Sequence, residues 1–346
     1  MKIASGNSLV SIIAPAYNAS KYIEDFILSI IGQEYIYWEL LIVDDGSTDN
    51  TIEIIKKYSS VDKRIKIIQR EREPKGSVTC RNIGQELAKG KYIIHFDADD
   101  IVRNYCLLQR VAFMEANADV DYATFKGVSV VERDGKFVFA GRNWGQPTDK
   151  DLLKSFLEAN YPFSVWNNIY RAEIFKGLLW DEKVKIYTDF SYIVPIIIKG
   201  YEHRFCSDGK VDYLYRTGIN TAMTSNFISE DKYESTKYLF TKTLNQLKGF
   251  QNEKYYKNCF KKFYILHARR VFHDGSKEQI IDFYSYCLNA YKEDSNIRLK
   301  MAKTLLGSIK RDSKLYAKTV NGIFMLLYTP KIFFKTVLSK AGVKRK

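Results

Sequence analysis

The first third of the chain alternates short apolar runs with segments of helical character. In residues 19–33 the apolar side chains lie three and four positions apart, which predicts an amphipathic helix, and further helices are expected up to Tyr58 and near residues 78–88. Uninterrupted apolar strands separated by helices are typical of a parallel sheet covered on both faces, so we expect an α/β fold. The runs with the length and branching of buried strands lie at residues 9–14, 40–43, 65–69 and 92–96.

After residue 117 the apolar runs become shorter and the order of elements changes. Asp134-Gly135 has the composition of a tight turn, so the strands on either side of it are expected to form a hairpin. Two helices are expected, the second of which contains Pro195. The strands are predicted at residues 121–126, 128–131 and 136–140, and the helices at residues 151–160 and 190–198.

From about residue 229 the sequence is helical in character, with many Lys and Tyr and few Gly or Pro. We expect one domain over residues 1–225 and a basic helical region over residues 226–346. Residues 231–346 carry 25 Lys and Arg against 9 Asp and Glu, whereas the first 230 residues carry 29 against 31. The net charge of +14 therefore resides in the C-terminal region, and such asymmetry indicates an anionic partner surface, either lipid or nucleic acid.

The overall composition is that of a folded protein, with 46% hydrophobic and 27% charged residues. The five cysteines are widely spaced and lack a C-x-x-C pair, so neither a disulfide framework nor a zinc site is expected, and a reducing compartment fits best. Residues 1–8 are polar, and we expect no signal peptide. The sequence also lacks an uninterrupted apolar run of about 20 residues, so we expect a cytoplasmic protein.

Acidic residues gather where predicted strands end. Asp97, Asp99 and Asp100 directly follow the strand at 92–96, and Asp44-Asp45 follows the strand at 40–43. Carboxylates at the end of a buried strand repel one another and lose hydration, so they usually need a counter-charge. Mg²⁺ and Mn²⁺ favour such oxygen ligands and commonly hold substrate phosphates as well. The alternative is a polar exit from the strand, with an Asp capping a helix that begins near Asn104.

Four motifs follow one another along the chain, each at the end of a strand or helix. Together they resemble the nucleotide-sugar-binding half of family-2 glycosyltransferases, which are inverting enzymes with the GT-A fold, a mostly parallel Rossmann-like sheet flanked by helices. The resemblance covers roughly residues 8–216 and leaves the last third of the chain unexplained. The motifs are Pro15-Ala16-Tyr17-Asn18, Val43-Asp44-Asp45-Gly46-Ser47-Thr48-Asp49, Arg81-Asn82-x-Gly84 and Asp97-Ala98-Asp99-Asp100.

The resemblance implies a UDP-sugar donor held by the first two motifs. Tyr17 offers a flat face for the base, and the backbone at Pro15 and Ala16 can meet ribose or uracil atoms. Asp45 can accept the uracil N3–H, a donor that cytosine lacks, with Asp44 beside it. Alternatively, Asp-Gly-Ser-Thr-Asp forms a turn and caps the next helix, and both roles are compatible.

The last two motifs are expected to hold the donor diphosphate. Arg81 suits phosphate because its guanidinium stays charged at any working pH, although a surface ion pair with Glu86 or Asp99 is the alternative. By resemblance Asp99 is the direct ligand of a divalent metal, and Asp97 and Asp100 order ribose, water or the surroundings of the ion, with Ala98 between them. The family favours Mn²⁺ over Mg²⁺. A cation on the diphosphate neutralises the departing UDP.

An inverting transfer needs one general base opposite the leaving group. Asp189 matches the family's base, whereas Thr188 stands where the family usually has Glu, which puts acceptor contacts and the tuning of Asp189 in doubt. Asp189 can alternatively cap the following helix. Trp166 and Asn167 resemble an acceptor-side segment in which a Trp stacks on a sugar, although a buried core Trp is the alternative. Arg216 ends a Tyr-Arg strand and is expected near the diphosphate.

The basic region contains an apolar, aromatic segment at residues 323–338, interrupted by Pro330 and Lys335. Such a segment suits the membrane interface, which predicts peripheral contact with the anionic inner face of the cell membrane and access to an undecaprenyl-linked or other saccharide acceptor. The alternative is a tail helix that packs on the protein core.

The sequence argues against several other functions. A nucleotidyltransferase or a dinucleotide oxidoreductase needs a glycine-rich phosphate loop after the first strand, where this chain has Pro-Ala-Tyr-Asn. Nucleic-acid binding through the basic region is not expected, because no binding module is recognised there. A catalytically silent sugar-binding homologue remains an alternative because of Thr188.

Overall fold

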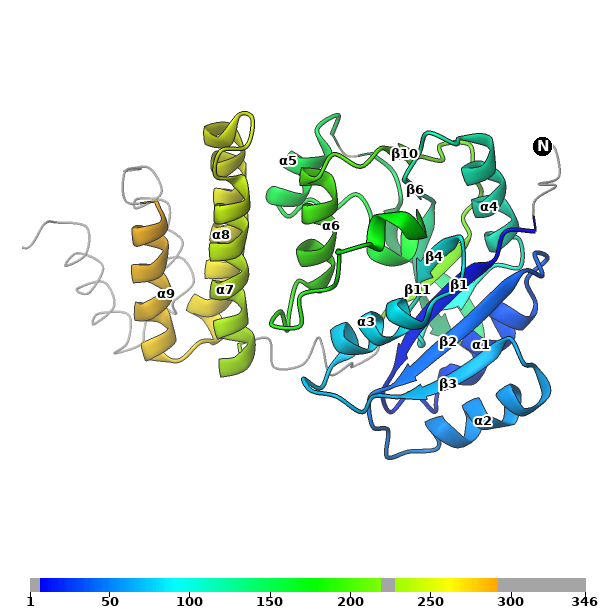
Figure 1. Cartoon of the computed structure of the whole chain (residues 1–346). Helices are drawn as coiled ribbons and strands as arrows, with labels where there is room; N and C mark the ends of the chain where they lie inside the picture. The colour runs from blue at the N-terminus through cyan, green and yellow to red at the C-terminus, as the bar shows by residue number, and fades with distance from the viewer. Residues whose placement is uncertain (1–6, 148, 219–227, 292–346) are drawn as a thin grey trace, which may run out of the picture. The chain divides into compact units, whose positions relative to one another are not determined.

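The computed structural model describes residues 7–147, 149–218 and 228–291. These residues divide into two compact units. Of the described residues, those from 7 to 156 and from 160 to 218 form one unit, and residues 157–159 and 228–291 form the other. Figure 1 shows the sheets in the first unit and long helices in the second. The prediction that residues 323–338 bind a membrane lies outside the described residues.

The first unit is built on a seven-stranded sheet with the order β10-β6-β9-β4-β1-β2-β3. Strands β1 to β4 pair in parallel, as the apolar runs predicted, whereas β9 runs antiparallel to both β4 and β6. Since β1 and β2 pair from Val10↔Trp38 to Ala16↔Asp44, their carboxyl ends meet at one edge. The strands are β1 (Val10–Ala16), β2 (Trp38–Asp44), β3 (Ile65–Gln69), β4 (Tyr92–His95), β6 (Tyr122–Thr124), β9 (Asn168–Arg171) and β10 (His203–Phe205).

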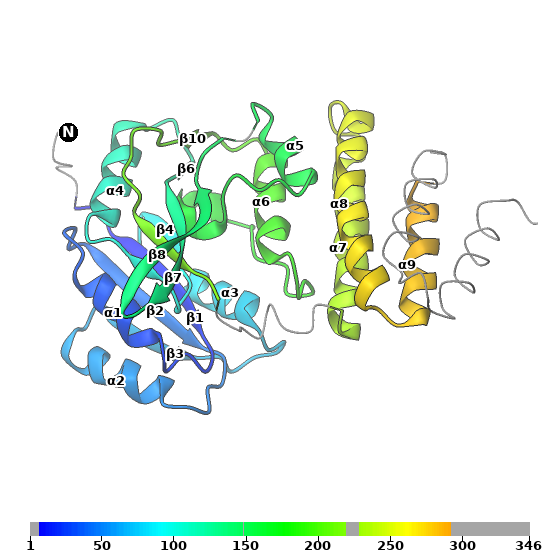
Figure 2. The same ribbon diagram turned by 180° about the vertical axis from the view of Figure 1, so that it is seen from behind.

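Helices cover both faces of this sheet (Figures 1 and 2). Val10, Ile12 and Ala14 of β1 share one buried cluster with apolar residues of α1 and α4, while Ile13 points to the other face and meets α3. The alternation of β1 side chains therefore separates two apolar layers. The helices are α1 (Ile23–Ile31), α2 (Thr51–Val61), α3 (Ser77–Leu87), α4 (Cys106–Ala116), α5 (Leu152–Leu157) and α6 (Thr188–Ile198).

Two predicted helices are shorter than the sequence pattern indicated. Residues 19–22 form a turn in which Ala19 O accepts from Tyr22 N and Ile23 N, and the helix proper begins at Ile23. The α5 helix ends before Ala159, whose φ of 56° is left-handed and ends the helical path. Local turn geometry determines where these two helices begin and end, whereas the spacing of apolar residues predicts longer helices.

A smaller sheet with the order β5-β11-β7-β8 lies beside the acidic loop. The predicted hairpin is confirmed, with Asp134 and Gly135 at φ 50° and 70° between β7 and β8. The loop after β4 enters this sheet through β5, which pairs with β11, so the Tyr-Arg strand and the acidic loop are neighbours. The strands are β5 (Ile101–Val102), β7 (Gly127–Arg133), β8 (Lys136–Trp144) and β11 (Tyr213–Arg216).

The packing of α3 against the sheet explains why the third motif has a glycine at position 84. A Cβ at this position would lie 2.5 Å from Cγ2 of Ile13 on β1. The close approach lets α3 pack directly on the sheet, and α3 in turn carries Arg81. Gly84 therefore positions Arg81 through backbone packing.

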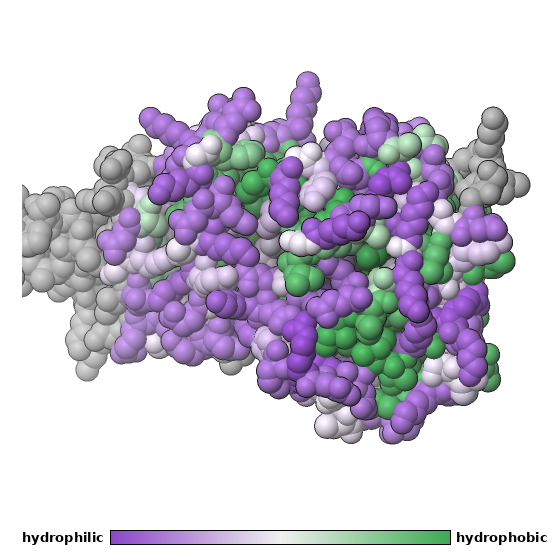
Figure 3. All heavy atoms as spheres, viewed as in Figure 1, coloured by the Kyte–Doolittle hydropathy of each residue, from purple (hydrophilic) through white to green (hydrophobic). Residues whose placement is uncertain are grey.

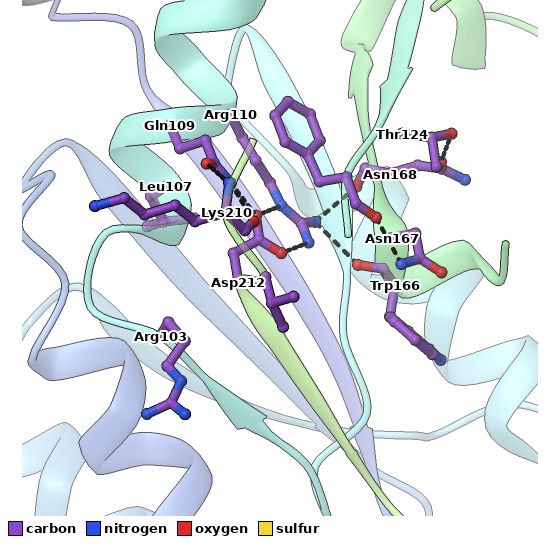
Figure 4. A network of polar contacts seen from close by, with 12 residues as sticks. Arg103, Leu107, Gln109, Arg110, Thr124, Trp166, Asn167, Asn168, Lys210 and Asp212 are labelled. Atoms are coloured by element: carbon purple, nitrogen blue, oxygen red, sulfur yellow. Dashed lines mark hydrogen bonds and ion pairs between the residues drawn. The ribbon is translucent and has the colours of Figure 1, made fainter. Parts of the chain in front are cut away.

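An ion pair that is inaccessible to solvent joins three elements of the first unit. Arg110 of α4 donates to both carboxylate oxygens of Asp212 and to the carbonyl oxygens of Trp166 and Asn168 (Figure 4). Trp166 lies in the short 3-10 helix η1 (Val165–Asn167), and Asp212 immediately precedes β11. The pair therefore joins α4, β11 and η1.

The second unit contains three described helices, which confirms helical structure from residue 230 to 290. Their core is aromatic, with Phe240 packed on Phe260, Phe263 and Phe283. Hydrophilic side chains cover most of the viewed surface of α7 and α8 (Figure 3). Among the described residues, none of the helices is long and apolar enough to cross a bilayer. The helices are α7 (Glu230–Leu247), α8 (Glu253–Asp274) and α9 (Lys277–Ala290).

Candidate active site

The two aspartates that end β2 have different surroundings. The Asp44 carboxylate accepts from Gly46 N, Ser47 N and Ser47 Oγ at 2.5–3.0 Å, so it folds the Asp-Gly-Ser turn. Asp45 Oδ1 accepts from Arg70 Nε at 2.5 Å and Gly76 N at 3.1 Å. Its Oδ2 has no hydrogen bond within the described chain, and the side chain is 7% exposed. Asp45 is thus fixed by one oxygen and has the other left to accept from a ligand.

The first motif lies against this turn. Pro15 and Ala16 pair with Val43 and Asp44 across the strands, and Ala16 O accepts from Asp45 N at 2.9 Å. Tyr17 is 41% exposed, and the Lys75 ammonium lies 3.8 Å from the centroid of its ring. Because Lys75 and Arg70 both belong to the loop after β3, this loop borders the predicted base pocket.

Arg81 is buried in α3 and reaches the acidic loop. Its Nη2 donates to Asp97, whereas sequence reasoning had named Glu86 and Asp99 as its alternative partners. Its Nη1 is buried and has no hydrogen-bond partner among the described residues. A buried guanidinium nitrogen without a partner is costly, so an incoming acceptor oxygen would be stabilised there.

The three acidic side chains after β4 fall into two groups. Asp100 is fully buried and accepts from Tyr213 Oη and Arg216 N at 2.7 Å each, so both its oxygens hold β11 in place. Asp97 and Asp99 remain partly exposed. Burial and the neighbouring Asp97 raise the pKa of Asp99 to about 6. Burial, Asp99 and Asp97 raise the pKa of Asp100 well above its usual value.

These surroundings fit a divalent cation at Asp97 and Asp99. A pair of crowded, partly exposed carboxylates is destabilised by mutual repulsion, which a cation would relieve. Asp100 fits a structural role, since its oxygens already accept two hydrogen bonds. Within the described residues, no group of three or more His, Cys, Asp or Glu side chains is placed to hold a metal by itself. A cation at this loop would therefore need ligand oxygens from elsewhere, such as phosphates.

Asp189 lies in the first turn of α6, and its Oδ2 accepts from Ser164 Oγ and from Val165 N. The residue is partly exposed. Burial raises the pKa of Asp189, the Ser164 hydroxyl lowers it, and the Asp97 carboxylate raises it further. The carboxylate is therefore anchored at one oxygen and lies in the field of the acidic loop.

Tyr215 of β11 interacts electrostatically with carboxylates from two different elements. Burial raises the pKa of its phenol, and the carboxylates of Asp97, Asp100, Asp99 and Asp189 raise it further. Its ring is partly exposed and stacks on Trp166 at 5.6 Å between centroids. The acidic loop and Asp189 thus act on the same side chain from two different elements.

Two predicted acceptor-side residues belong instead to the protein core. Trp166 is 2% exposed and stacks on Tyr213 with 4.4 Å between centroids, so the alternative of a core Trp is the correct one. Asn167 is fully buried, donates to Phe125 O and accepts from Ser164 N. Asn167 therefore orders the turn that carries Ser164, whose hydroxyl bonds Asp189. The Trp166 ring and the Asn167 amide therefore already contact other residues of the fold.

The last two predicted site residues, Thr188 and Arg216, lie in different surroundings. Thr188 is 7% exposed at the first residue of α6, next to Asp189. Arg216 is buried, pairs with Asp25 at 3.2 Å and Glu132 at 3.5 Å, and donates from its backbone to Asp100. Its Nε has no partner among the described residues. Its positive charge acts on the acidic loop, because it lowers the pKa of Asp99.

Sequence reasoning missed three side chains of this site. Ser164 bonds Asp189, Arg70 fixes Asp45, and Tyr215 lies among the carboxylates. The first had a detectable signal, since Ser164 and Asn167 form a capping box around η1. Arg70 follows β3 directly, at the sheet edge where ligands of parallel sheets bind.

Known proteins resemble this chain both in sequence and in fold. The sequence pattern of glycosyl transferase family 2 matches residues 11–179. An uncharacterized glycosyltransferase of Haemophilus influenzae is 34% identical over 241 residues, 66% of this chain and 71% of that protein. WfgD of Escherichia coli, named UDP-Glc:alpha-D-GlcNAc-diphosphoundecaprenol beta-1,3-glucosyltransferase, is 37% identical over 131 residues, 38% of this chain and 51% of WfgD.

The fold matches that of Staphylococcus aureus TarS, whose residues 1–349 were crystallised in complex with UDP-GlcNAc. The TM-score is 0.63 at 19% identity, over 97% of this chain and 93% of that one, which identifies a GT-A fold. The chain spans 40–71% of the length of its curated relatives. On the strength of these matches, the chain belongs to glycosyl transferase family 2.

Proposed function

We propose that the protein transfers a sugar from a UDP-sugar to a hydroxyl of a saccharide acceptor, with inversion at the anomeric carbon. The observation that supports this proposal is that the carboxylates of Asp189, Asp97, Asp99 and Asp100 all act electrostatically on the phenol of Tyr215, and that Asp97 acts on Asp189. Asp189 is anchored on α6, a different element from the crowded acidic loop, so one could supply the base and the other the leaving-group site.

The proposed donor site runs from Tyr17 to Arg81. The free Oδ2 of Asp45 accepts the uracil N3–H, because Arg70 and Gly76 fix the other oxygen. The exposed ring of Tyr17 lies beside the base, and Arg81 Nη1 donates to the diphosphate. A UDP-sugar is also the donor in the name of WfgD and the ligand of the TarS crystal.

Asp99, with Asp97 beside it, would hold Mn²⁺ or Mg²⁺ together with donor phosphates. Such a cation, when bound, supplies positive charge that neutralises the diphosphate leaving group. In this arrangement Arg81 would bind the diphosphate through Nη1 while Nη2 keeps its existing ion pair with Asp97. Asp100 keeps β11 attached to the loop whether or not a cation is present.

In the proposed reaction, the acceptor hydroxyl oxygen attacks the anomeric carbon from the side opposite UDP. The new carbon–oxygen bond forms as the bond from the anomeric carbon to the β-phosphate oxygen breaks, and UDP leaves with that electron pair. Asp189 takes the hydroxyl proton at the oxygen that Ser164 and Val165 leave free. Burial helps because a carboxylate with a raised pKa is a stronger base.

The acceptor proposed here is a saccharide, free or linked to undecaprenyl diphosphate, as in the name of WfgD. The basic character of residues 226–346 supports peripheral contact with an anionic membrane, where such an acceptor would reside. No contact with nucleic acid is proposed. Flotation with anionic liposomes of the full chain and a 1–318 truncation tests this part, and equal flotation contradicts it.

UDP release tests the transfer itself. The purified full chain is incubated with a panel of UDP-sugars and saccharide acceptors in Mn²⁺, Mg²⁺ or EDTA. We expect metal-stimulated turnover with one donor, a loss of about 10²–10⁴-fold in Asp189→Asn, and unchanged UDP affinity in that variant. Asp208→Asn, at an exposed carboxylate, is the matched control.

Two outcomes count against the proposal. Undiminished turnover in Asp189→Asn would remove the base from the mechanism. UDP-sugar binding without turnover by the wild-type protein would favour a catalytically silent sugar-binding homologue, the alternative that the Thr188 substitution raises.

A further inference from the structure

The end of strand β8 holds one arginine in a fixed position at the surface. The guanidinium carbon of Arg142 lies 3.4 Å from the centroid of the Trp144 ring, and Nη2 donates to Tyr161 O at 2.9 Å. Arg142 itself is exposed to solvent. A stacked guanidinium with one anchored nitrogen loses less entropy when it binds a ligand than a freely rotating side chain does.

The charge of Arg142 is not neutralised by the protein. Across residues 7–147, 149–218 and 228–291, no Asp or Glu forms an ion pair with it, and its only protein acceptor is a neutral carbonyl. The buried arginines Arg81, Arg110 and Arg216 have carboxylate partners. Arg171, which lies over the Tyr92 ring, has none among the described residues, but it donates to several backbone carbonyl oxygens. Most of the five N–H donors of Arg142 are therefore available to an external anion.

Contacts connect Arg142 to two aromatic residues near the proposed site. The ring of Tyr161, whose carbonyl holds Arg142, lies 6.4 Å from Phe190, the residue after Asp189. On the other side, Trp144 contacts Tyr215 at 6.3 Å between centroids. Tyr215 is the side chain on which the acidic loop and Asp189 both act.

The carboxylates at the centre of the site repel anions, so a positive charge nearby would help a negatively charged acceptor to bind. Asp97, Asp99 and Asp189 lie together, so a negatively charged acceptor approaching Asp189 meets like charge. Arg81 offsets part of this repulsion, since it pairs with Asp97 and lowers the pKa of Asp189. Arg142 stacks on Trp144, which contacts Tyr215, so its unneutralised charge can attract an anion to this part of the site.

We propose that Arg142, Trp144 and Tyr215 form an acceptor subsite for a saccharide that carries an oxyanion, a phosphate or a carboxylate, next to the hydroxyl to be glycosylated. The Arg142 fork binds two oxygens of the anion, and the partly exposed aromatic rings contact the sugar. This inference rests on the proposed function and names the acceptor class of that same site.

Binding to the UDP-loaded full chain tests the subsite without requiring the true acceptor. UDP is first titrated into the protein in Mn²⁺ and its affinity is measured, so that the donor site is filled. N-acetylglucosamine 1-phosphate, glucuronate and neutral N-acetylglucosamine are then titrated by calorimetry at fixed ionic strength. We expect the phosphorylated sugar or glucuronate to bind at least tenfold more tightly than the neutral sugar, and the two arms identify which anion is preferred.

The preference should disappear in Arg142→Gln and persist in part in Arg142→Lys, which keeps the charge without the fork. Arg133→Gln, on the exposed tip of the same hairpin, is the matched control and should bind as the wild type does. Equal binding of charged and neutral sugars by the wild-type protein, or an undiminished preference in Arg142→Gln, overturns the subsite. Failure of UDP to bind in the first step instead overturns the proposed function, and the inference falls with it.

Discussion

Arg110 and Asp212 face each other through two hydrogen bonds of 2.9 and 2.8 Å, and neither side chain is exposed to solvent. The pair holds β11 to α4, and Arg110 also binds the carbonyl of Trp166 in η1. Tyr213, which bonds the acidic loop, follows Asp212, and Ser164, which bonds Asp189, precedes η1. One buried ion pair thus supports both halves of the candidate site.

We therefore expect Arg110→Met to destabilise the protein by about 3–5 kcal/mol, because it leaves the Asp212 carboxylate buried and unpaired. Urea unfolding of the full chain, followed by far-UV circular dichroism, measures the change. Arg204→Met is the control, since Arg204 pairs with Asp119 at the surface and should be nearly neutral. Equal effects of the two substitutions would contradict a structural role for the buried pair.

Gly84→Ala is expected to destabilise the protein by about 1–3 kcal/mol, because the added Cβ would lie 2.5 Å from Ile13 Cγ2. The shift of α3 also moves Arg81, so UDP affinity should fall. A double-mutant cycle with Ile13→Ala, read by urea unfolding, is the control: the smaller side chain leaves room for the Cβ, so the double variant should be more stable than the sum of the single changes predicts. Strict additivity would show that the contact is not the cause.

The sequence alone was sufficient to predict that the carboxyl ends of β1, β2 and β4 lie at one edge of the sheet. Apolar runs mark where strands end, and parallel strands place those ends at one edge, so Asp45 and Asp97 could be expected near each other before any coordinates. The same reasoning could not distinguish the roles of Asp97, Asp99 and Asp100 in the acidic loop. Whether Asp99 or Asp100 faces solvent depends on Tyr213, which is 113 residues away from Asp100 in sequence.

The acceptor half was harder for the same reason. Trp166 has the same local sequence whether it faces a sugar or packs on Tyr213, and only the pairing of β11 with its neighbours decides between them. Arg142 lies in a strand whose side chains are mostly exposed, so its sequence surroundings carry no functional signal. Its fixed position follows from Trp144 and Tyr161, which contact it in the folded chain.

The acidic loop should make the metal-free protein less stable as pH rises. The pKa of Asp99 is raised to about 6 in the folded state, so folding favours the protonated form. The stability associated with that proton is fully present below about pH 4 and is lost as pH rises through about 6. Asp99→Asn removes this loss, and with allowance for solvent screening we expect it to be about 1–2 kcal/mol more stable than the wild type at pH 7.5.

Thermal unfolding in EDTA at pH 4 and pH 7.5 measures this difference, with Asp119→Asn as the control at an exposed carboxylate. The Asp99→Asn and wild-type curves should converge at pH 4. Mn²⁺ with UDP should then raise the wild-type melting temperature at pH 7.5 and have little effect on the variant. A stability difference that is the same at both pH values would show that Asp99 does not titrate in this range.

Ser164→Ala should change the pH dependence of transfer as well as its rate. Asp189 acts as a base only when ionised, and the Ser164 hydroxyl lowers its pKa by donating to Oδ2. Loss of that donor raises the pKa of Asp189, so the acidic limb of kcat/KM against pH should move to higher pH. The facing groups, Asp97, Arg81, Tyr170 and Tyr215, stay in place. Ser164→Thr keeps a hydroxyl and should restore the wild-type limb, whereas a rate loss with an unmoved limb in Ser164→Ala would mean that Ser164 only shapes the turn before η1.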